Sequence, residues 1–98
     1  MTYAVRIRPD AERDLEDAAN WYELQRQGLG LEFLDSVEET LGLIQKHPSM
    51  FPVVHKNSRR ALIHKFPFGV HYVIADETIV VLAVMHGSRD PKRWKSRT

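Results

Sequence analysis

The second half of the chain carries the clearest pattern of apolar and polar positions. Apolar side chains dominate residues 60–86 and are interrupted by two short segments of turn-forming composition. The first is Phe66-Pro67-Phe68-Gly69, where proline pre-sets the backbone of the second turn position and glycine suits the fourth. The second is Ala75-Asp76-Glu77-Thr78, a weaker signal because it contains no glycine. The pattern predicts three strands joined as a meander.

Alternation divides these strands between two faces of the predicted sheet. If both loops are two residues long, His64 faces His71, and His71 faces Leu82. One face then collects Leu62, His64, Phe66, His71, Val73, Val80, Leu82, Val84 and His86. The other collects Ala61, Ile63, Val70, Tyr72, Ile74, Ile79, Val81, Ala83 and Met85. The second face is nearly free of polar groups, so we expect helices to cover it and the first face to stay open as a binding surface.

The first half of the chain predicts a short strand and two helices. Residues 3–8 alternate in a way that is typical of a strand with one buried face. The helices are expected over residues 11–26 and 31–46. Their apolar stripes are Ala11, Leu15, Ala18 and Tyr22 in the first helix, and Leu34, Val37, Leu41 and Ile44 in the second, widened by Leu31 and Phe33.

Residues with strong positional preferences mark the helix ends. Asp10 is the expected N-cap of the first helix, Gly28-Leu29-Gly30 lets the chain reverse, and His47-Pro48 stops the second helix. The predicted element order is β-α-α-β-β-β. We expect one α+β domain over residues 1–98, a two-layer sandwich with an N-terminal strand, a helical hairpin packed on one face of an antiparallel sheet, and a basic C-terminal tail.

Composition narrows the class of protein. The chain has no cysteine, which excludes a disulfide framework and a thiolate zinc site. Its longest purely apolar run, Ile79 to Met85, has seven residues, whereas a membrane span needs about 20. The N-terminus lacks the apolar core of a signal peptide. We expect a soluble, cytoplasmic protein with no membrane partner.

Charge is unevenly distributed, although the net charge is only +1. Residues 10–46 contain ten acidic and three basic side chains, whereas residues 47–98 contain nine basic and three acidic ones. All five histidines lie in the second half. The acidic half fits solvated helices, and the basic half suits a polyanion or an acidic partner.

Three histidines, His64, His71 and His86, fall on the predicted open face. Histidines that bind a metal must converge and need supporting carboxylates, but His86 lies too far along the sheet from His71 for shared ligation. We expect no metal site and no cofactor. His64 and His71 are interpreted as a cross-strand pair. His86 is a candidate general base because it ends a strand near Arg60 and Arg89, and a surface or capping role is the alternative.

The tail, residues 87–97, contains five basic residues, one acidic residue and Trp94. One interpretation is contact with nucleic acid or an acidic protein, with Trp94 as anchor or stacking platform. The other is a solvated basic end with Trp94 folded back onto the sheet edge. The sequence contains no nucleophile elbow, no phosphate-cradling glycine loop and no zinc-protease helix motif.

A series of short motifs spans nearly the whole chain. These are Gly28-x-Gly30-x-x-Phe33, His47-Pro48, Phe66-Pro67-Phe68-x-Val70-x-Tyr72 and His86-Gly87-x-Arg89-Asp90-Pro91-x-x-Trp94. Together with the predicted element order, they resemble the RelE/ParE superfamily of toxins from type II toxin–antitoxin modules. The resemblance implies a small growth-inhibiting protein in a hetero-oligomer with a cognate antitoxin, whose disordered segment folds across the toxin.

The superfamily divides by mechanism, and two positions favour one branch. RelE-like members cut messenger RNA on the ribosome; they typically carry an arginine three residues before the strand tyrosine, and a tyrosine or histidine near the C-terminus. Here these positions hold Gly69 and Trp94, and neither can stabilise a phosphorane or move a proton. The pattern looks more like the ParE branch, whose members poison DNA gyrase without hydrolysing RNA.

Three functions follow, in order of preference. The first is a ParE-like toxin that contacts DNA gyrase through Arg89, Lys92, Arg93 and Trp94. The second is an endoribonuclease acting on messenger RNA at the ribosome, with candidate site residues His86, Arg89 and Arg60. The third is a non-toxic binding module with the same fold. For the antitoxin, we expect contacts on the open sheet face at Leu62, His64, His71 and Leu82.

Overall fold

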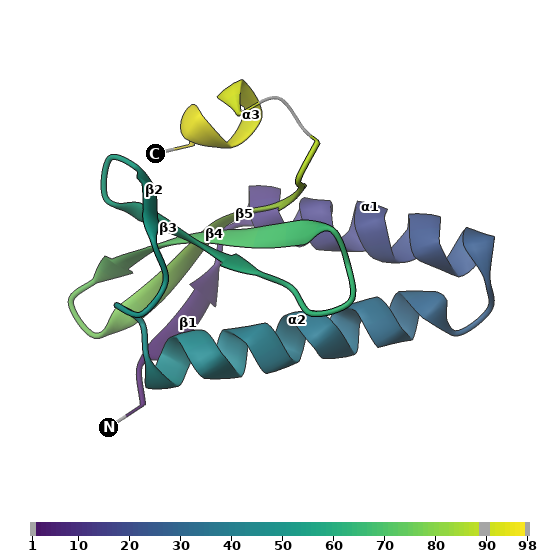
Figure 1. The fold of residues 1–98 in the computed structure, drawn as a ribbon, viewed down its shortest axis with the longest axis horizontal. Coiled ribbons are helices and arrows are strands. Elements are labelled where there is room, and N and C mark those ends of the chain that lie inside the picture. Colours follow the sequence, from purple (N-terminus) through teal and green to yellow (C-terminus); the bar gives the residue numbers. More distant parts are fainter. Residues whose placement is uncertain (1, 89–90, 98) are drawn as a thin grey trace.

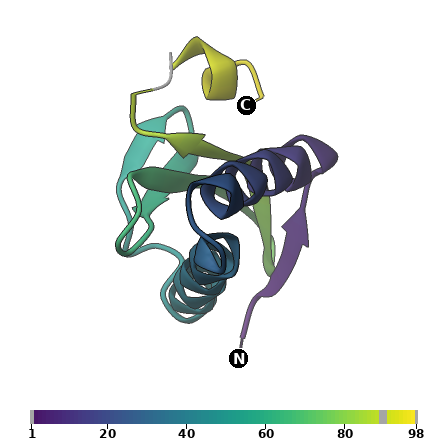
Figure 2. The same ribbon diagram turned by 90° about the vertical axis from the view of Figure 1, so that its right-hand side faces the viewer.

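The computed structural model describes residues 2–88 and 91–97. Two long helices cover one side of a five-stranded sheet, and a short helix lies on the other side (Figure 1 and Figure 2). The elements follow in the order β1 (Ala4–Ile7), α1 (Pro9–Gln25), α2 (Leu29–Lys46), β2 (Val53–His55), β3 (Ser58–Leu62), β4 (Phe68–Ala75), β5 (Thr78–His86) and α3 (Lys92–Lys95). The predicted α+β sandwich is confirmed, and β2 and α3 extend the predicted order.

The strands lie side by side in the order β1-β5-β4-β3-β2. Strands β3 to β5 pair antiparallel, as the meander predicted. The additional strand β2 pairs antiparallel with β3, whereas β1 pairs with β5 in parallel. The helical hairpin carries the chain from β1 at one edge to β2 at the other (Figure 1). The parallel pairing ends at Ile7 opposite Val81. Beyond Val81, no described strand pairs with this edge of β5, and the tail and α1 meet there.

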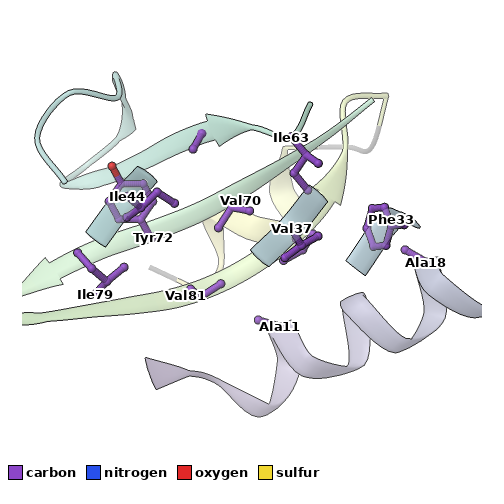
Figure 3. Close-up of a cluster of buried hydrophobic side chains, with 12 residues drawn as sticks. Ala11, Ala18, Phe33, Val37, Ile44, Ile63, Val70, Tyr72, Ile79 and Val81 are labelled. Carbon is purple, nitrogen blue, oxygen red and sulfur yellow. The ribbon is translucent and has the colours of Figure 1, made fainter. Parts of the chain in front are cut away.

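The core fills the space between the helical hairpin and the sheet (Figure 3). Helix α1 contributes Ala11 and Ala18, and helix α2 contributes Phe33, Val37 and Ile44. The sheet contributes Ala61, Ile63, Val70, Tyr72, Ile79, Val81 and Val84. The Tyr72 hydroxyl donates a hydrogen bond of 2.6 Å to the carbonyl of Pro48, so this buried polar group is satisfied.

The stripe of α2 differs from the prediction in its first turns. The predicted positions that do contact the core are Phe33, Val37, Leu41 and Ile44. Leu34 is 40% exposed and Leu31 is 64% exposed, so their placement in the core was wrong. Phe33 is fully buried, as predicted, because α2 turns the row of Phe33, Val37 and Ile44 towards the sheet. Leucines beside that row remain at the surface, which is common in small domains.

The helix boundaries also depart from the prediction at one cap. Helix α1 begins at Pro9, which suits the first helical position, and Arg8 is the N-cap without a side-chain hydrogen bond. Asp10 is therefore not the N-cap. Its carboxylate lies inside the first turn and accepts a hydrogen bond from Arg13, which lowers the pKa of Asp10. An acidic residue there still favours the helix through the macrodipole.

The junction between the two helices requires glycine at two positions for different reasons. Gly28 has φ of 88°, a left-handed conformation that side chains rarely adopt. At Gly30 a Cβ atom would lie 2.6 Å from the carbonyl oxygen of Ala19, so only glycine permits this approach of α2 to α1. The Glu23 carboxylate accepts hydrogen bonds from the main-chain N–H groups of Gly28 and Gly30. The predicted reversal at these glycines is confirmed.

The register of the sheet corrects the predicted pairing of the histidines. The β4–β5 turn has the predicted two-residue length, and Tyr72 pairs with Val81. A β-bulge follows between His71 and Tyr72, so that His71 pairs with Ala83 rather than Leu82. On its other side His71 pairs with Arg60 rather than His64, because the chain leaves β3 at Leu62 and forms a longer connection to β4.

The bulge also exchanges the faces of the last residues of β5, because one extra residue reverses the alternation that follows it. Val84, expected on the open face, lies in the core with the helices. Ala83 and Met85, expected beneath the helices, pack on the opposite face with Trp94. The face assignment is confirmed for residues before the bulge, such as Ile79 and Val81.

Candidate functional site

Trp94 covers the sheet face opposite the long helices. Its side chain is only 7% exposed and packs against Ala83, Met85 and Val54. The ring stacks on the imidazole of His71, with centroids 4.2 Å apart and planes inclined by 22°. The sheet face that the sequence predicted to be open is therefore partly closed by α3. Of the two interpretations of Trp94, the structure shows the ring folded back onto the sheet.

His71 is held neutral by this arrangement. It is 2% exposed, and its Nδ1 has no hydrogen-bond partner among the described residues. Burial, followed by the positive charges of Arg60 and Arg97, lowers the pKa of His71 to about 4. A neutral imidazole carries no charge into the stack with Trp94, so the low pKa and the buried stack are consistent with each other.

A second contact ties the tail to α1. Arg97 donates hydrogen bonds to the Asp14 carboxylate at 2.7 Å and to the carbonyl of Leu82 at 3.1 Å. Asp14 also accepts a hydrogen bond of 3.0 Å from the main-chain N–H of Val84. The carbonyl of Leu82 and the N–H of Val84 belong to the edge of β5 that β1 leaves unpaired. Side chains from α1 and the tail thus satisfy main-chain groups that a neighbouring strand would otherwise pair.

Beside Trp94 lies a pocket of about 300 Å³, which we call the outer-face pocket. It is lined by Arg60, Leu62, Ile63, Phe66, Pro67, Phe68, Gly69, His71, Met85, His86, Gly87, Pro91 and Trp94. Among the described residues that line it, Arg60 is the basic side chain of fixed charge, and none is acidic. The pocket thus combines apolar walls with a positive charge.

Gly69 shapes this pocket through its missing side chain. A Cβ atom at Gly69 would lie 2.9 Å from Cγ of Arg60 and 3.0 Å from Cδ. The aliphatic stem of Arg60 therefore crosses β4 at the place where other residues have a side chain. Gly69, expected from the sequence only as the loss of a catalytic arginine, makes room for a different arginine.

The hydrogen bonds of His86 determine its tautomer. Its Nδ1 accepts a hydrogen bond of 3.0 Å from the main-chain N–H of Ser88, and the Ser88 hydroxyl lies 2.8 Å away. A main-chain N–H can only donate, so in the neutral ring the proton must sit on Nε2. The ring edge also contacts Phe68, with centroids 5.3 Å apart. In this state Nε2 of His86 is a donor rather than a base.

A larger groove of about 650 Å³ runs between α1 and the end of β5. It is lined by Asp14, Asp17, Ala18, Trp21, Tyr22, Pro67, Phe68, Val84, Met85, His86, Ser88 and Arg93. Trp21 is 57% exposed on its rim. Trp21 was not among the residues predicted to be functional. Its position beside the apolar stripe of α1 was the available signal, because a large aromatic residue outside the buried stripe must lie at the surface.

The residues predicted to bind an antitoxin do not form one surface. Leu62 is 71% exposed, and His64 is exposed but lies in the β3–β4 connection rather than on a strand. His71 and Leu82 are buried, at 2% and 3% exposure. The prediction of one continuous open face was wrong because the register differs and the tail covers the sheet.

The residues predicted for nuclease or target contact divide into three groups. Arg60 and His86 line the same pocket, as a shared site requires. Lys92 and Arg93 are exposed on α3. Arg89 lies outside the described residues.

Within residues 2–88 and 91–97, no three His, Cys, Asp or Glu side chains are grouped so that they could hold a metal ion. No described helix has the length and apolar character to cross a membrane.

Several known proteins are similar to this chain. A protein-family model described as "ParE toxin of type II toxin-antitoxin system, parDE" matches residues 5–91. Toxin ParE2 of Mycobacterium tuberculosis, recorded in two strains, is 32% identical over 95 residues, which span 93% of this chain and 88% of the relative.

Two solved structures are similar in fold. One is from the chromosomal ParDE system of P. aeruginosa, with a TM-score of 0.77, 15% identity, and coverage of 87% of this chain and 96% of that chain. The other is from the toxin–antitoxin complex RelBE2 of Mycobacterium tuberculosis, with a TM-score of 0.63, 24% identity, and coverage of 88% and 99%.

Proposed function

Because the chain belongs to the family of ParE toxins of type II toxin–antitoxin systems, we propose that it inhibits growth by binding DNA gyrase and that a cognate antitoxin neutralises it. The family membership confirms the superfamily resemblance of its motifs. The gyrase target is our proposal, as are the antitoxin, a toxin–antitoxin hetero-oligomer and a cytoplasmic location. The two structural relatives come from a ParDE system and from the RelBE2 toxin–antitoxin complex, which supports an antitoxin partner.

The surroundings of His71 and His86 are the main reason for proposing DNA gyrase rather than RNA as the target. Cleavage of a phosphodiester bond needs a group that removes a proton and donors that stabilise the charge that develops. His71 is buried beneath the ring of Trp94, and Nδ1 of His86 is occupied by the N–H of Ser88. Trp94 has only an indole N–H, and Gly69 has no side chain. This arrangement supports action through binding rather than through hydrolysis.

The target surface in this proposal is the exposed side of α3. Lys92 and Arg93 are exposed there, and Arg89 is the further predicted contact. Trp94 is buried, so its role is to hold α3 on the sheet rather than to insert into the target. The basic residues can then meet a partner surface in a defined orientation, which reduces the entropy lost on binding.

One structural observation favours a second function. Arg60 and His86 line the same pocket, and this is the pair that an endoribonuclease of the RelE type would use. If the His86 ring carried its proton on Nδ1 and gave up the hydrogen bond from Ser88, Nε2 would become an acceptor in the pocket that Arg60 also lines. The ribonuclease therefore stays as the alternative, and a non-toxic binding module is the third candidate.

The testing experiment compares gyrase supercoiling and messenger RNA cleavage for wild type and variants. We expect Arg93→Glu to weaken gyrase inhibition at least about tenfold, because a few contact residues carry much of the binding free energy. Trp94→Ala should weaken inhibition to a similar extent by releasing α3 from the sheet. Trp94→Phe should retain inhibition because a phenyl ring can still pack on His71. Arg6→Glu, the same charge change on the exposed face of β1, is the control.

The outcomes separate the three functions. Loss of supercoiling with intact messenger RNA supports the proposed gyrase target. Codon-phased cleavage that disappears in His86→Ala, with gyrase unaffected, would replace it by the ribonuclease. If expression of the wild type leaves growth unchanged, the non-toxic module is the correct function.

A further inference from the structure

The outer-face pocket contains an arginine side chain without a described partner. The guanidinium of Arg60 makes no hydrogen bond or ion pair with residues 2–88 or 91–97, whereas its neighbour Arg59 donates to the carbonyls of Ser49 and Phe51. Arg60 is also the residue whose stem Gly69 accommodates. An arginine held over a pocket whose described lining has no acidic residue is suited to an anion.

Two imidazole groups in the pocket are compatible with an anion. Because Nδ1 of His86 accepts from Ser88, its Nε2–H remains a donor. His71 lines the same pocket, is 2% exposed, and has an Nδ1 without a partner among the described residues.

The rest of the outer-face pocket is lined by apolar side chains, which favour an anion with an apolar neighbour. Leu62 is 71% exposed at the rim, and Phe66, Phe68, Met85 and Pro91 complete an apolar lining. The volume of about 300 Å³ is at the small end of ligand pockets. It suits one or two side chains better than a length of nucleic acid.

Nucleic acid is also disfavoured by the state of the aromatic ring. Binding of single strands depends on exposed aromatic faces on which bases stack. Trp94 is 7% exposed, and His71 already lies over its ring. A single arginine without an available stacking face fits a carboxylate with an apolar neighbour better than a phosphate chain.

We propose that the outer-face pocket binds a carboxylate side chain of the antitoxin, with Arg60 as its ion-pair partner and an adjacent apolar side chain of the same segment against Leu62. This inference rests on the proposed function, since it names the chemistry by which the neutralising partner engages the toxin. Arg60 thereby joins Leu62, which was already a predicted antitoxin contact, on this surface.

The test uses two blocked tripeptides as probes and the chain of residues 1–98 as receptor. Leu-Glu-Leu supplies the carboxylate between apolar side chains, and Leu-Gln-Leu is its neutral counterpart. Binding is followed by NMR through the amide signals of Gly69, His71 and Gly87. We expect Leu-Glu-Leu to bind at least about tenfold more tightly than Leu-Gln-Leu, because hydrogen bonds to charged groups contribute more than neutral ones.

Variants then assign the preference to one residue. Arg60→Ala should remove the difference between the two peptides, and Arg60→Lys should retain only part of it because an ammonium cannot bind a carboxylate in bidentate fashion. Arg6→Ala, an equal loss of charge on exposed β1, should leave it unchanged. Unfolding curves of each variant confirm that the fold is intact.

The results distinguish this inference from the proposed function. Equal binding of both peptides, or an unchanged preference in Arg60→Ala, overturns the inference even where the antitoxin still neutralises the toxin. Signal shifts caused by a short oligoribonucleotide and by neither peptide also overturn it and favour RNA. Selective binding of Leu-Glu-Leu by a chain that fails to inhibit growth would support the pocket and reject the proposed function.

Discussion

Acidification should loosen the contact between α3 and the sheet through His71. The docked ring has a pKa of about 4, against an ordinary value of 6.5. Between these values, the unfolded chain takes up a proton at His71 and the folded chain does not. The free energy of unfolding must therefore fall as the pH falls through this range, by about 1.4 kcal/mol per pH unit at most. The full effect is about 3 kcal/mol, and about 2 kcal/mol of it is lost by pH 5.

The groups around His71 determine the sign. Arg60 faces it from β3, Arg97 follows α3, and both oppose a positive charge on the ring. The His55 ring contacts the other partner of the stack, with its centroid 6.0 Å from that of Trp94. No carboxylate is among the described groups that shift His71, so protonation finds no compensating negative charge there. Charged His71 should leave the stack or destabilise it.

The assay is urea unfolding at pH 7, 6 and 5, followed by tryptophan fluorescence. Trp21→Phe provides the background, because Trp21 is 57% exposed and its removal leaves Trp94 as the reporter. The control is His71→Phe, which keeps a ring against Trp94 but cannot titrate. Other histidines and carboxylates change the stability of both proteins with pH. The difference between their losses of unfolding free energy therefore reports on His71 alone. The reasoning fails if both proteins lose the same stability between pH 7 and pH 5.

Three further predictions test the packing. Ile44→Ala should lower the free energy of unfolding by about 2–5 kcal/mol because Ile44 is fully buried. Leu34→Ala should lower it by less than about 1.5 kcal/mol because Leu34 is 40% exposed. Equal losses in denaturant melts would contradict the observed orientation of α2. Gly30→Ala should lower the melting temperature because the added Cβ meets a main-chain oxygen at 2.6 Å, and an unchanged value would show that the helices can separate. Asp14→Asn should cost about 1–3 kcal/mol by removing the charge opposite Arg97, and the loss should largely disappear in an Arg97→Ala background in a double-mutant cycle.

The sequence determined the elements whose causes are local. Helical spacing of apolar residues located α1 and α2 to within about two residues, the usual uncertainty of helix ends. Gly28 and Gly30 marked the reversal between them, and the stop at His47-Pro48 agrees with the end of α2 at Lys46. The turn after Ala75 set the register as far as Tyr72 opposite Val81. The family resemblance used the same local motifs.

The tertiary structure decided what depends on distant residues. The bulge beside His71 reversed the faces of Val84 and Met85, and no local signal marks where an extra residue enters a strand. Alternation propagates such a shift to every later residue, so the predicted open face could not be correct beyond it. The site on that face was predicted in part: Arg60 and His86 do line one pocket, but the sequence could not show that His71 is buried.

The docking of the tail was also a tertiary result. Trp94 had two interpretations because a tryptophan in a basic segment suits both a target and the protein's own sheet. The free edge of β5, the bulge and the stack on His71 together favour the second. Arg97 and Asp14 are 83 residues apart in sequence, and their pairing exists only because β1 ends at Ile7 and leaves main-chain groups of β5 to be satisfied. Contacts of this kind depend on which atoms the completed fold leaves unpaired, so a residue pattern along the chain cannot specify them.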